Sequence, residues 1–241
     1  MIIEIDAGNS RLKWRCRDPQ SVRATPARVA DSVSAIAAEL EVASVERVHI
    51  ASVRAPEYLE QLARECEQVF NVKVNVARVS AQCGGLRIRY ADPARLGVDR
   101  WLAMLAARSM APTACLVVDC GTALTIDRIA EDGEHGGGFI LPGLALMRRS
   151  LEENTRIRLD AGFEAGSIAL GNSTDEAVYH GTLAAAVAVI QAQWQALNNA
   201  SGSARLILTG GGASELGAHL ASQGVEIISD LVLDGLRVSQ G

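Results

Sequence analysis

The segment from Asp6 to Lys13 gathers residue types that suit phosphate binding around one tight turn. An acid, Asp6, ends an apolar run, and Gly8 leaves the backbone bare. Backbone N–H groups beside a glycine can approach phosphate oxygens closely, an acid can hold hydrated Mg²⁺, and Lys13 supplies a neutralising charge. An ordinary hairpin turn explains the same residues. The candidate phosphate-binding residues are Asp6, Ala7, Gly8, Asn9, Ser10, Arg11, Leu12 and Lys13.

A second copy of this pattern lies in the other half of the chain. An apolar run again ends in an acid, Asp119, which is followed by Gly121 and the hydroxyl of Thr122. Each copy precedes another β-rich run, so we expect two hairpins with Asp and Gly at the turn, suited to the two ends of a triphosphate. A third candidate is Gly210–Gly212, which follows an apolar run and could lie against a base or sugar, or be only a flexible connection.

Short β-rich runs alternate with longer amphipathic stretches, which predicts an α/β fold. The expected strands are 2–6, 12–16, 47–52, 73–79, 115–119, 124–129, 205–209 and 225–228. The expected long helices are 27–40, 57–70, 97–110 and 175–197. The internal repeat implies two similar halves, and we place their boundary near Pro112, giving domains 1–112 and 113–241.

Composition excludes several classes of protein. The 241 residues include 23 Lys and Arg against 28 Asp and Glu, a net charge of −5, so nucleic acid is not an expected partner. The most apolar stretch, 183–190, is far shorter than the roughly 20 residues of a membrane span, so no membrane partner is expected. The chain opens with a strand-like run rather than a secretory signal, and its five cysteines form no C-x-x-C pair. We therefore expect a cytoplasmic protein with reduced thiols.

Two phosphate turns and a late glycine-rich segment, in this order, resemble the actin-like ATPase and sugar-kinase superfamily. Within it, the runs 90–101 (YADPARLGVDRW) and 136–143 (GGGFILPG) are similar to segments of type III pantothenate kinases. Together with 6–13, 119–127 and 180–182, the resemblance covers nearly the whole chain in the family's order. It implies two actin-like (ribonuclease H-like) halves with mixed sheets and an ATP cleft between them.

The resemblance also implies an activity, the ATP-dependent phosphorylation of pantothenate that opens coenzyme A synthesis. Asp99 is then the catalytic base, and Arg100 binds the anionic substrate. Residues that match the family's ATP contacts are 6–13 and Thr122, and Asp119 matches its site for a monovalent cation, K⁺ or NH₄⁺. Mg²⁺ with ATP and a homodimer are implied as well. The remaining substrate-binding positions are Tyr90, Gly97, Val98 and Thr182.

Each of these positions also has a purely structural interpretation. Asp99 and Arg100 suit the first turn of a helix as a capping acid and a surface cation. Tyr90 suits a half-buried aromatic position, and Thr182 suits a helix hydroxyl that bonds its own backbone. Asp119 suits a hydrogen-bonded turn acid.

Two other functions stay open at this point. One is a non-catalytic, nucleotide-binding transcriptional accessory protein, which the presence of Asp6, Asp99, Arg100 and Asp119 together disfavours. The other is a kinase or phosphatase of the same fold that acts on another substrate, such as a sugar or polyphosphate. The segment 90–100 separates that option from a pantothenate kinase.

Overall fold

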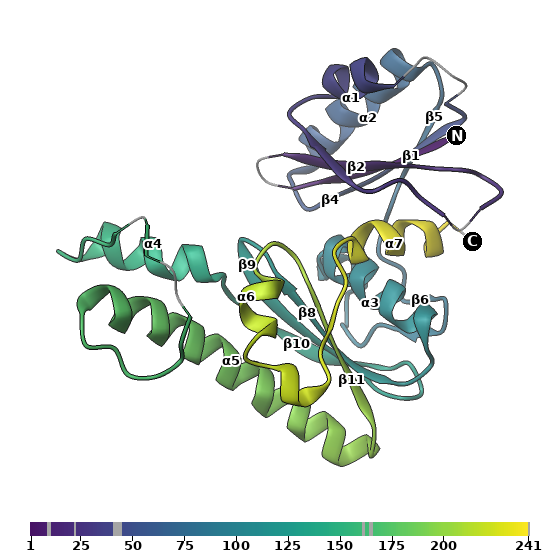
Figure 1. Ribbon diagram of the computed structural model, residues 1–241. Coiled ribbons are helices and arrows are strands. Elements are labelled where there is room, and N and C mark those ends of the chain that lie inside the picture. The colour runs from purple at the N-terminus through teal and green to yellow at the C-terminus, as the bar shows by residue number, and fades with distance from the viewer. Residues whose placement is uncertain (9–10, 22, 41–44, 161, 164–165, 241) are drawn as a thin grey trace. The chain divides into compact units, whose positions relative to one another are not determined.

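The computed structural model describes residues 1–8, 11–21, 23–40, 45–160, 162–163 and 166–240 (Figure 1). Within these residues the chain forms two compact units. The first comprises residues 1–84, 90–109 and 230–241, and the second comprises residues 85–89 and 110–229. The sequence predicts a boundary near Pro112, and in the structure the C-terminal segment from Asp230 belongs to the first unit.

The first unit is built on a five-stranded mixed sheet with the order β3-β2-β1-β4-β5. β1 pairs antiparallel with β2 and parallel with β4, so the expected first hairpin is confirmed. In β1, Ile3 and Ile5 alternate with Glu4 and Asp6, so the two kinds of side chain lie on opposite faces of the sheet. The strands are β1 (Ile2–Ala7), β2 (Leu12–Arg17), β3 (Arg28–Ala30), β4 (Arg47–Ser52) and β5 (Lys73–Val76).

Helices cover both faces of this first sheet. Ile3 and Ile5 pack with Ile36 of α1 (Val33–Glu39) and Leu62 of α2 (Pro56–Phe70). The other face meets α7 (Leu231–Val238), and there Arg15 bridges buried Glu4 (2.7 Å) and Asp234 (2.7 Å). The unit also contains β6 (Gln82–Cys83), the 3₁₀ turn η1 (Pro93–Arg95) and α3 (Val98–Met110). α7 is thus held to the sheet by ion pairs that no local pattern reveals.

The second unit repeats the same strand order, β10-β9-β8-β11-β12. β8 pairs antiparallel with β9 and parallel with β11, so the second expected hairpin is confirmed as well. The strands are β8 (Ala114–Cys120), β9 (Ala123–Ile129), β10 (His135–Pro142), β11 (Ala204–Thr209) and β12 (Glu226–Ile227), and β7 (Leu86–Arg87) lies outside this sheet. Both sheets therefore support their Asp-x-Gly turn on a central strand.

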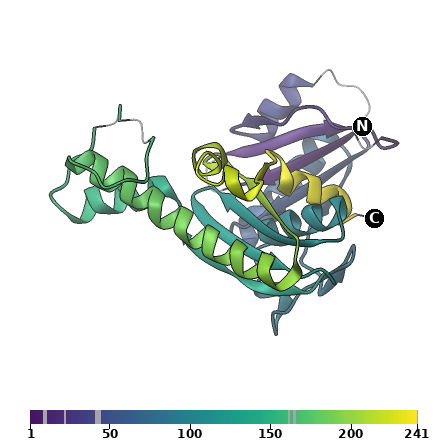
Figure 2. The same cartoon turned by 60° about the horizontal axis from the view of Figure 1, so that its bottom comes forward.

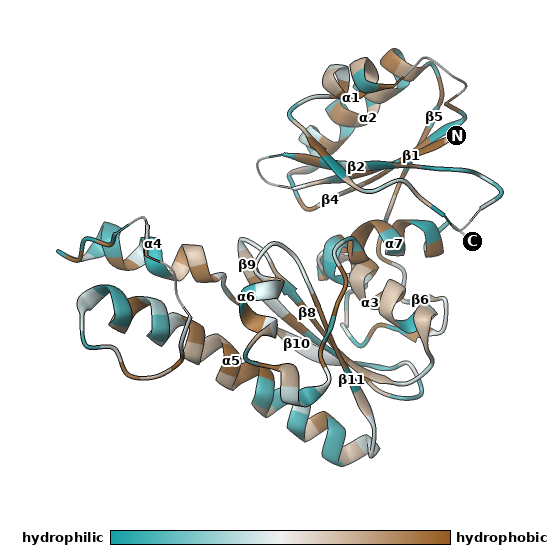
Figure 3. Ribbon diagram, in the orientation of Figure 1, coloured by the Kyte–Doolittle hydropathy of each residue, from teal (hydrophilic) through white to brown (hydrophobic). Residues whose placement is uncertain are grey.

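The 28-residue helix α5 (Thr174–Ser201) packs on one face of the second sheet, against β8 and β11 (Figures 1 and 2). Leu116 and Val118 pack with Leu183 and Val187 there, and Figure 3 shows the middle of this helix as apolar. Beside α5 lie α4 (Leu144–Asn154) and α6 (Ala213–Gly217), and η2 (Ala221–Gln223) follows α6. Ser173 caps α5 by accepting from the Glu176 backbone N–H (3.1 Å). No helix of the described residues has the length and apolar character needed to cross a membrane.

Several expected elements differ from the structure. The expected helix 27–40 is wrong over its first residues, because 28–30 pairs with β2 and the helix starts only after the Ser32 cap. The expected strand 73–79 ends at Val76. β10, which completes the second sheet, was missed because three glycines make its run look like a loop.

Candidate active site

The first turn follows β1 at the edge where the parallel strands β1 and β4 end. Asp6 lies in register between Lys13 on β2 and Ala51 on β4. The Lys13 ammonium is 2.8 Å from the carboxylate of Asp230, and the Ser52 hydroxyl donates to the Ala7 carbonyl (3.1 Å). Lys13 is therefore already ordered beside Asp6 by an acid from the C-terminal segment.

The eight candidate residues of this turn divide by side-chain exposure. Ala7 and Leu12 are buried in the core, so only their backbone is available to a ligand, whereas Arg11 is exposed. Asn9 and Ser10 lie outside the described residues. The side chains able to contact a nucleotide among the described ones are therefore those of Asp6, Arg11 and Lys13.

Backbone groups pack closely around the second turn. Asp119 lies in register between Thr125 and Thr209, and Thr122 is exposed at the turn. The Gly143 N–H donates to the Thr122 carbonyl (2.9 Å), and the Gly212 N–H donates to the Cys120 carbonyl (2.9 Å).

Gly210 has a positive φ of 86° beside this second turn, and a Cβ there would overlap the Asp119 carboxylate and the backbone of Cys120. The structure thus brings the expected glycine-rich segment onto the Asp119 turn. The packing also buries Cys120, and burial raises the pKa of its thiol to about 12. The backbone at this turn is therefore tightly constrained.

Asp99 lies in the first turn of α3, two residues after Gly97, the glycine that precedes the helix. Its carboxylate accepts a hydrogen bond from the Arg100 backbone N–H (2.7 Å). A Cβ at Gly97 would stand 2.6 Å from the same carboxylate oxygen, so a glycine leaves room for it. The capping interpretation is consistent with this geometry, and the carboxylate is half-buried rather than enclosed.

Arg100 is not the surface cation that the local sequence allows. Its residue is only 6 % exposed, and its guanidinium donates to the hydroxyl of half-buried Tyr90 (3.2 Å). Tyr90, Gly97, Val98, Asp99 and Arg100 are thus gathered at the start of α3. A buried, oriented guanidinium is suited to binding a carboxylate.

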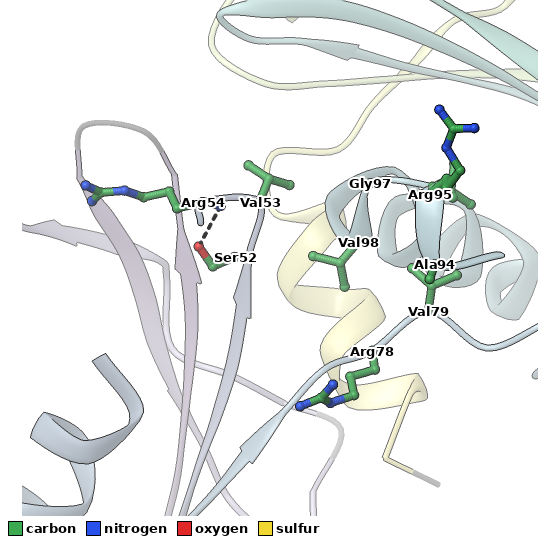
Figure 4. Close-up of a pocket in the computed structure, with 10 residues that line it drawn as sticks. Ser52, Val53, Arg54, Arg78, Val79, Ala94, Arg95, Gly97 and Val98 are labelled. Carbon is green, nitrogen blue, oxygen red and sulfur yellow. Dashed lines mark hydrogen bonds between the residues drawn. The ribbon is translucent and has the colours of Figure 1, made fainter. Parts of the chain in front are cut away.

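A cavity of about 490 Å³ adjoins this segment in the first unit (Figure 4). Gly97 and Val98 line it together with residues that follow β4 and β5. Apolar side chains, among them Val53, Val79 and Val98, lie between the segments in Figure 4. Three arginines, Arg54, Arg78 and Arg95, also belong to the lining, and Arg54 stacks on the ring of Tyr58 at 3.4 Å.

Thr182 lies in the second unit, on the buried side of α5. Its hydroxyl is within 2.9 Å of the Val178 carbonyl and 3.0 Å of the Tyr179 carbonyl, so the interpretation as a backbone-bonded hydroxyl is confirmed. Arg148 of α4 also donates to this hydroxyl (3.2 Å). Arg148 is not among the residues predicted from the sequence, where it is only one of two adjacent arginines with no motif around them.

The described residues contain no cluster of three or more His, Cys, Asp or Glu side chains arranged to hold a metal. Mg²⁺ bound with a nucleotide does not need such a cluster, because phosphates, waters and one or two carboxylates complete its shell. Asp6 and Asp119 each supply the carboxylate of an Asp-x-Gly turn.

Comparison with known proteins identifies the family. The family model for type III pantothenate kinase matches residues 2–196. A type III pantothenate kinase of Pseudomonas paraeruginosa is 39 % identical over 99 % of this chain and 98 % of its own length. Among solved structures, a Campylobacter jejuni protein assigned to the Baf family of transcriptional activators matches with a TM-score of 0.62 at 20 % identity, covering 98 % of this chain and 96 % of that one.

A Sinorhizobium meliloti protein assigned as a 2-dehydro-3-deoxygalactonokinase has a TM-score of 0.58 at 14 % identity over 99 % of this chain and 98 % of that one. At such identities the two structures show the fold alone, an α/β fold with mixed sheets shared with sugar kinases, as expected from the two turns. The family model and the curated relative go further. The chain belongs to the type III pantothenate kinase family.

Proposed function

We propose that this chain transfers the γ-phosphoryl group of ATP to the 4′-hydroxyl of pantothenate, giving 4′-phosphopantothenate and ADP. The observation that carries the proposal is the arrangement at the start of α3. There Gly97 makes room for the Asp99 carboxylate, and buried Arg100 lies with Tyr90 beside it. Membership of the family supports the choice of substrate.

Asp99 acts as the general base in this proposal. Phosphoryl transfer forms a bond between the acceptor oxygen and phosphorus and breaks the bond to the ADP oxygen, while the hydroxyl proton must pass to a base. A carboxylate at this position can accept that proton, and its Oδ1 is held in place by the Arg100 backbone N–H. The base and the substrate-binding residues would then come from one helix turn.

Arg100 and Tyr90 would orient the acceptor. Pantothenate carries a carboxylate, for which a buried guanidinium is a suitable partner. Arg54, Arg78 and Arg95 around the adjoining cavity add positive potential that attracts an anionic acceptor. Gly97 and Val98 would contribute backbone contacts to the acceptor, and Thr182 would contribute its hydroxyl oxygen.

The two Asp-x-Gly turns would hold the nucleotide. Lys13 would neutralise phosphate charge, the backbone at Ala7, Gly8 and Leu12 would donate to phosphate oxygens, and Thr122 would contact ATP from the second unit. Asn9, Ser10 and Arg11 complete the set. Mg²⁺, held by Asp6 and water, would supply charge neutralisation for the transferring phosphoryl group.

Asp119 would hold a monovalent cation, K⁺ or NH₄⁺. Its turn also carries the carbonyls of Cys120 and Thr122, which accept from Gly212 and Gly143, and carboxylate and carbonyl oxygens suit such an ion. The test is turnover in K⁺ buffer against Na⁺ buffer. We expect the unmodified chain to be less active in Na⁺ than in K⁺, and Asp119→Asn to be equally active in both buffers. Equal rates in the two buffers for the unmodified chain would contradict the site.

A homodimer and a cytoplasmic location belong to the same proposal. Exposed apolar side chains in the second unit support self-association: Phe139, Ile140, Leu146, Ile168 and Leu170, of which Leu170 is 96 % exposed. Light scattering would test it, and we expect Leu170→Asp to shift a dimer towards monomer. A monomeric unmodified chain would contradict the dimer.

Two alternatives are less well supported. A non-catalytic accessory protein needs no base, whereas Asp99 and Arg100 are both present and ordered. A kinase for another alcohol would not need the segment from Tyr90 to Arg100 in its family form.

The proposal is tested by ADP release from Mg-ATP with pantothenate, a hexose or no acceptor. We expect release that depends on pantothenate and is lost in Asp99→Asn. Release with the hexose alone would assign a different acceptor. Unchanged nucleotide binding without any acceptor-dependent release would favour the accessory protein.

A further inference from the structure

Arg148 joins three helices of the second unit around the Thr182 hydroxyl. Its Nε donates to Thr182 Oγ1 on α5 (3.2 Å), and its Nη2 donates to Glu215 Oε1 on α6 (2.7 Å). Its guanidinium also lies over the ring of Tyr179 at 4.3 Å. The Arg148 side chain is only 14 % exposed. A planar guanidinium held by a carboxylate and an aromatic face has little freedom to turn, so the hydrogen bond to Thr182 is geometrically fixed.

The hydrogen-bonding capacity of Thr182 can be counted from these contacts. A hydroxyl has one proton to donate and two lone pairs that accept. The proton must point to the helix carbonyls of Val178 and Tyr179, because a carbonyl cannot donate. One lone pair accepts from Arg148, because a guanidinium cannot accept. The hydroxyl therefore retains one accepting position and has no proton left for a ligand.

We propose that Arg148 is a positioning residue that fixes Thr182 as a pure hydrogen-bond acceptor, so that the site selects a substrate presenting an N–H or O–H group at this point. The inference rests on the proposed function, in which Thr182 faces the acceptor substrate. Pantothenate offers two such groups besides the reacting hydroxyl, namely its amide N–H and its 2′-hydroxyl. A substrate with only a carbonyl or ether oxygen there would meet a lone pair and be rejected.

The first experiment measures binding by calorimetry in the presence of a non-hydrolysable ATP analogue, so turnover is not required. The ligands are pantothenate, its ester analogue that lacks the N–H, and its 2′-deoxy analogue that lacks the hydroxyl. We expect one of the two analogues to bind about tenfold more weakly than pantothenate, because a buried partner is left unpaired. Thr182→Val should lose that discrimination, and Thr182→Ser should keep it.

The second experiment tests Arg148 itself by steady-state kinetics. Arg148→Met keeps the aliphatic length but removes the donors, so we expect the KM for pantothenate to rise about tenfold with the KM for ATP within about twofold. Arg148→Lys should recover part of the loss. Arg149→Met, at the exposed neighbouring position of the same helix, is the matched control and should behave like the unmodified chain.

A second control separates positioning from mere stability. Arg205 bonds Glu226 through two hydrogen bonds (2.8 and 2.7 Å) in the same unit but away from Thr182. Arg205→Met should lower the melting temperature without changing the KM for pantothenate.

The outcomes separate the inference from the proposed function. If pantothenate does not bind the unmodified chain, the proposed function fails. If pantothenate binds but neither analogue is discriminated, or if Arg148→Met changes only the melting temperature as Arg205→Met does, the inference is overturned.

Discussion

The two sheets share a strand order and an Asp-x-Gly turn, but the chain surrounds the two turns differently. At the first turn the neighbours are charged side chains: Lys13 lies across the hairpin from Asp6 and is held by Asp230. At the second turn the neighbours are backbone groups, since Gly143 and Gly212 donate to its carbonyls and Thr125 replaces the lysine. One repeated turn is thus specialised for charge in one unit and for close backbone packing in the other.

The same contrast appears at two glycines that lie against a carboxylate. Gly97 leaves room for Asp99, and the obstacle to a Cβ is the end of a side chain. Gly210 leaves room for Asp119, has a positive φ, and also meets the backbone of Cys120. A side chain can turn away from a new methyl group, whereas backbone cannot. We therefore expect Gly97 to matter mainly for catalysis and Gly210 mainly for stability.

The largest expected effect is the difference in kinetics between substitutions of Asp99 and of Asp119. Asp99→Asn removes the base, so kcat should fall by about 10²-fold to 10⁴-fold while pantothenate still binds. Asp119→Asn should instead weaken cation and nucleotide binding. The resulting loss of activity should therefore become smaller at high ATP concentration. Kinetics with calorimetry measure both. Near-normal kcat in Asp99→Asn would remove this residue from the mechanism.

The two glycines give the next effect. Gly210→Ala adds a methyl group against backbone at positive φ, so we expect it to lower the free energy of unfolding by roughly 1–3 kcal/mol. Gly97→Ala should cost less stability but lower kcat, because it displaces the Asp99 carboxylate. Urea unfolding and kinetics on the same two variants provide the comparison. Equal stability losses with unchanged kcat would contradict the assignment of roles.

A smaller effect is expected from the lysine that only the first turn has. Lys13→Met removes a phosphate partner and should raise the KM for ATP about tenfold with little change in the KM for pantothenate. Asp230→Asn should raise it less, because the lysine loses the acid that orders it but keeps its charge. Arg64→Met, an exposed position on α2, is the control. A KM for ATP that does not respond to Lys13→Met would place the phosphates elsewhere.

The smallest effect concerns two buried histidines. In the first unit, both ring nitrogens of His49 lack a hydrogen-bond partner among the described residues, whereas His135 in the second bonds Asp127 (3.0 Å). Burial lowers the pKa of His49 below its usual 6.5, against the opposing effect of Glu4. At mildly acid pH, His49 therefore binds a proton more readily in the unfolded chain than in the folded chain.

Stability should accordingly fall as the pH drops below about 6.5, by at most about 1.4 kcal/mol per pH unit from this one group. The slope of stability against pH is obtained from unfolding free energies measured between about pH 7 and about pH 5. His49→Gln should make it shallower, whereas His219→Gln, at a half-exposed position, should not. A slope unchanged by His49→Gln would show that other groups carry the pH dependence.

Local sequence patterns predict the central strands of each sheet but not the edges or the long-range pairs. Both hairpins follow from an apolar run, an acid and a glycine, which are local signals. β3 and β10 are edge strands whose pairing comes from the neighbouring strand rather than from their own propensity. The attachment of α7 depends on the ion pair of Arg15 with Asp234, which is far away in the sequence.

The candidate site divides in the same way. The segment from Tyr90 to Arg100 was predicted from a contiguous motif, and the structure brings Tyr90 and Arg100 into contact. The burial of Arg100 and the contacts of Arg148 with Thr182 and Glu215 join positions on separate elements, so only the fold reveals them.

The most direct test of the account is to identify the product. The unmodified chain is incubated with Mg-ATP and pantothenate in K⁺ buffer, and the products are analysed by mass spectrometry and ³¹P NMR. The account predicts ADP together with pantothenate phosphorylated on its 4′-hydroxyl, and neither product with Asp99→Asn. ADP formed together with free inorganic phosphate and unmodified pantothenate would contradict it.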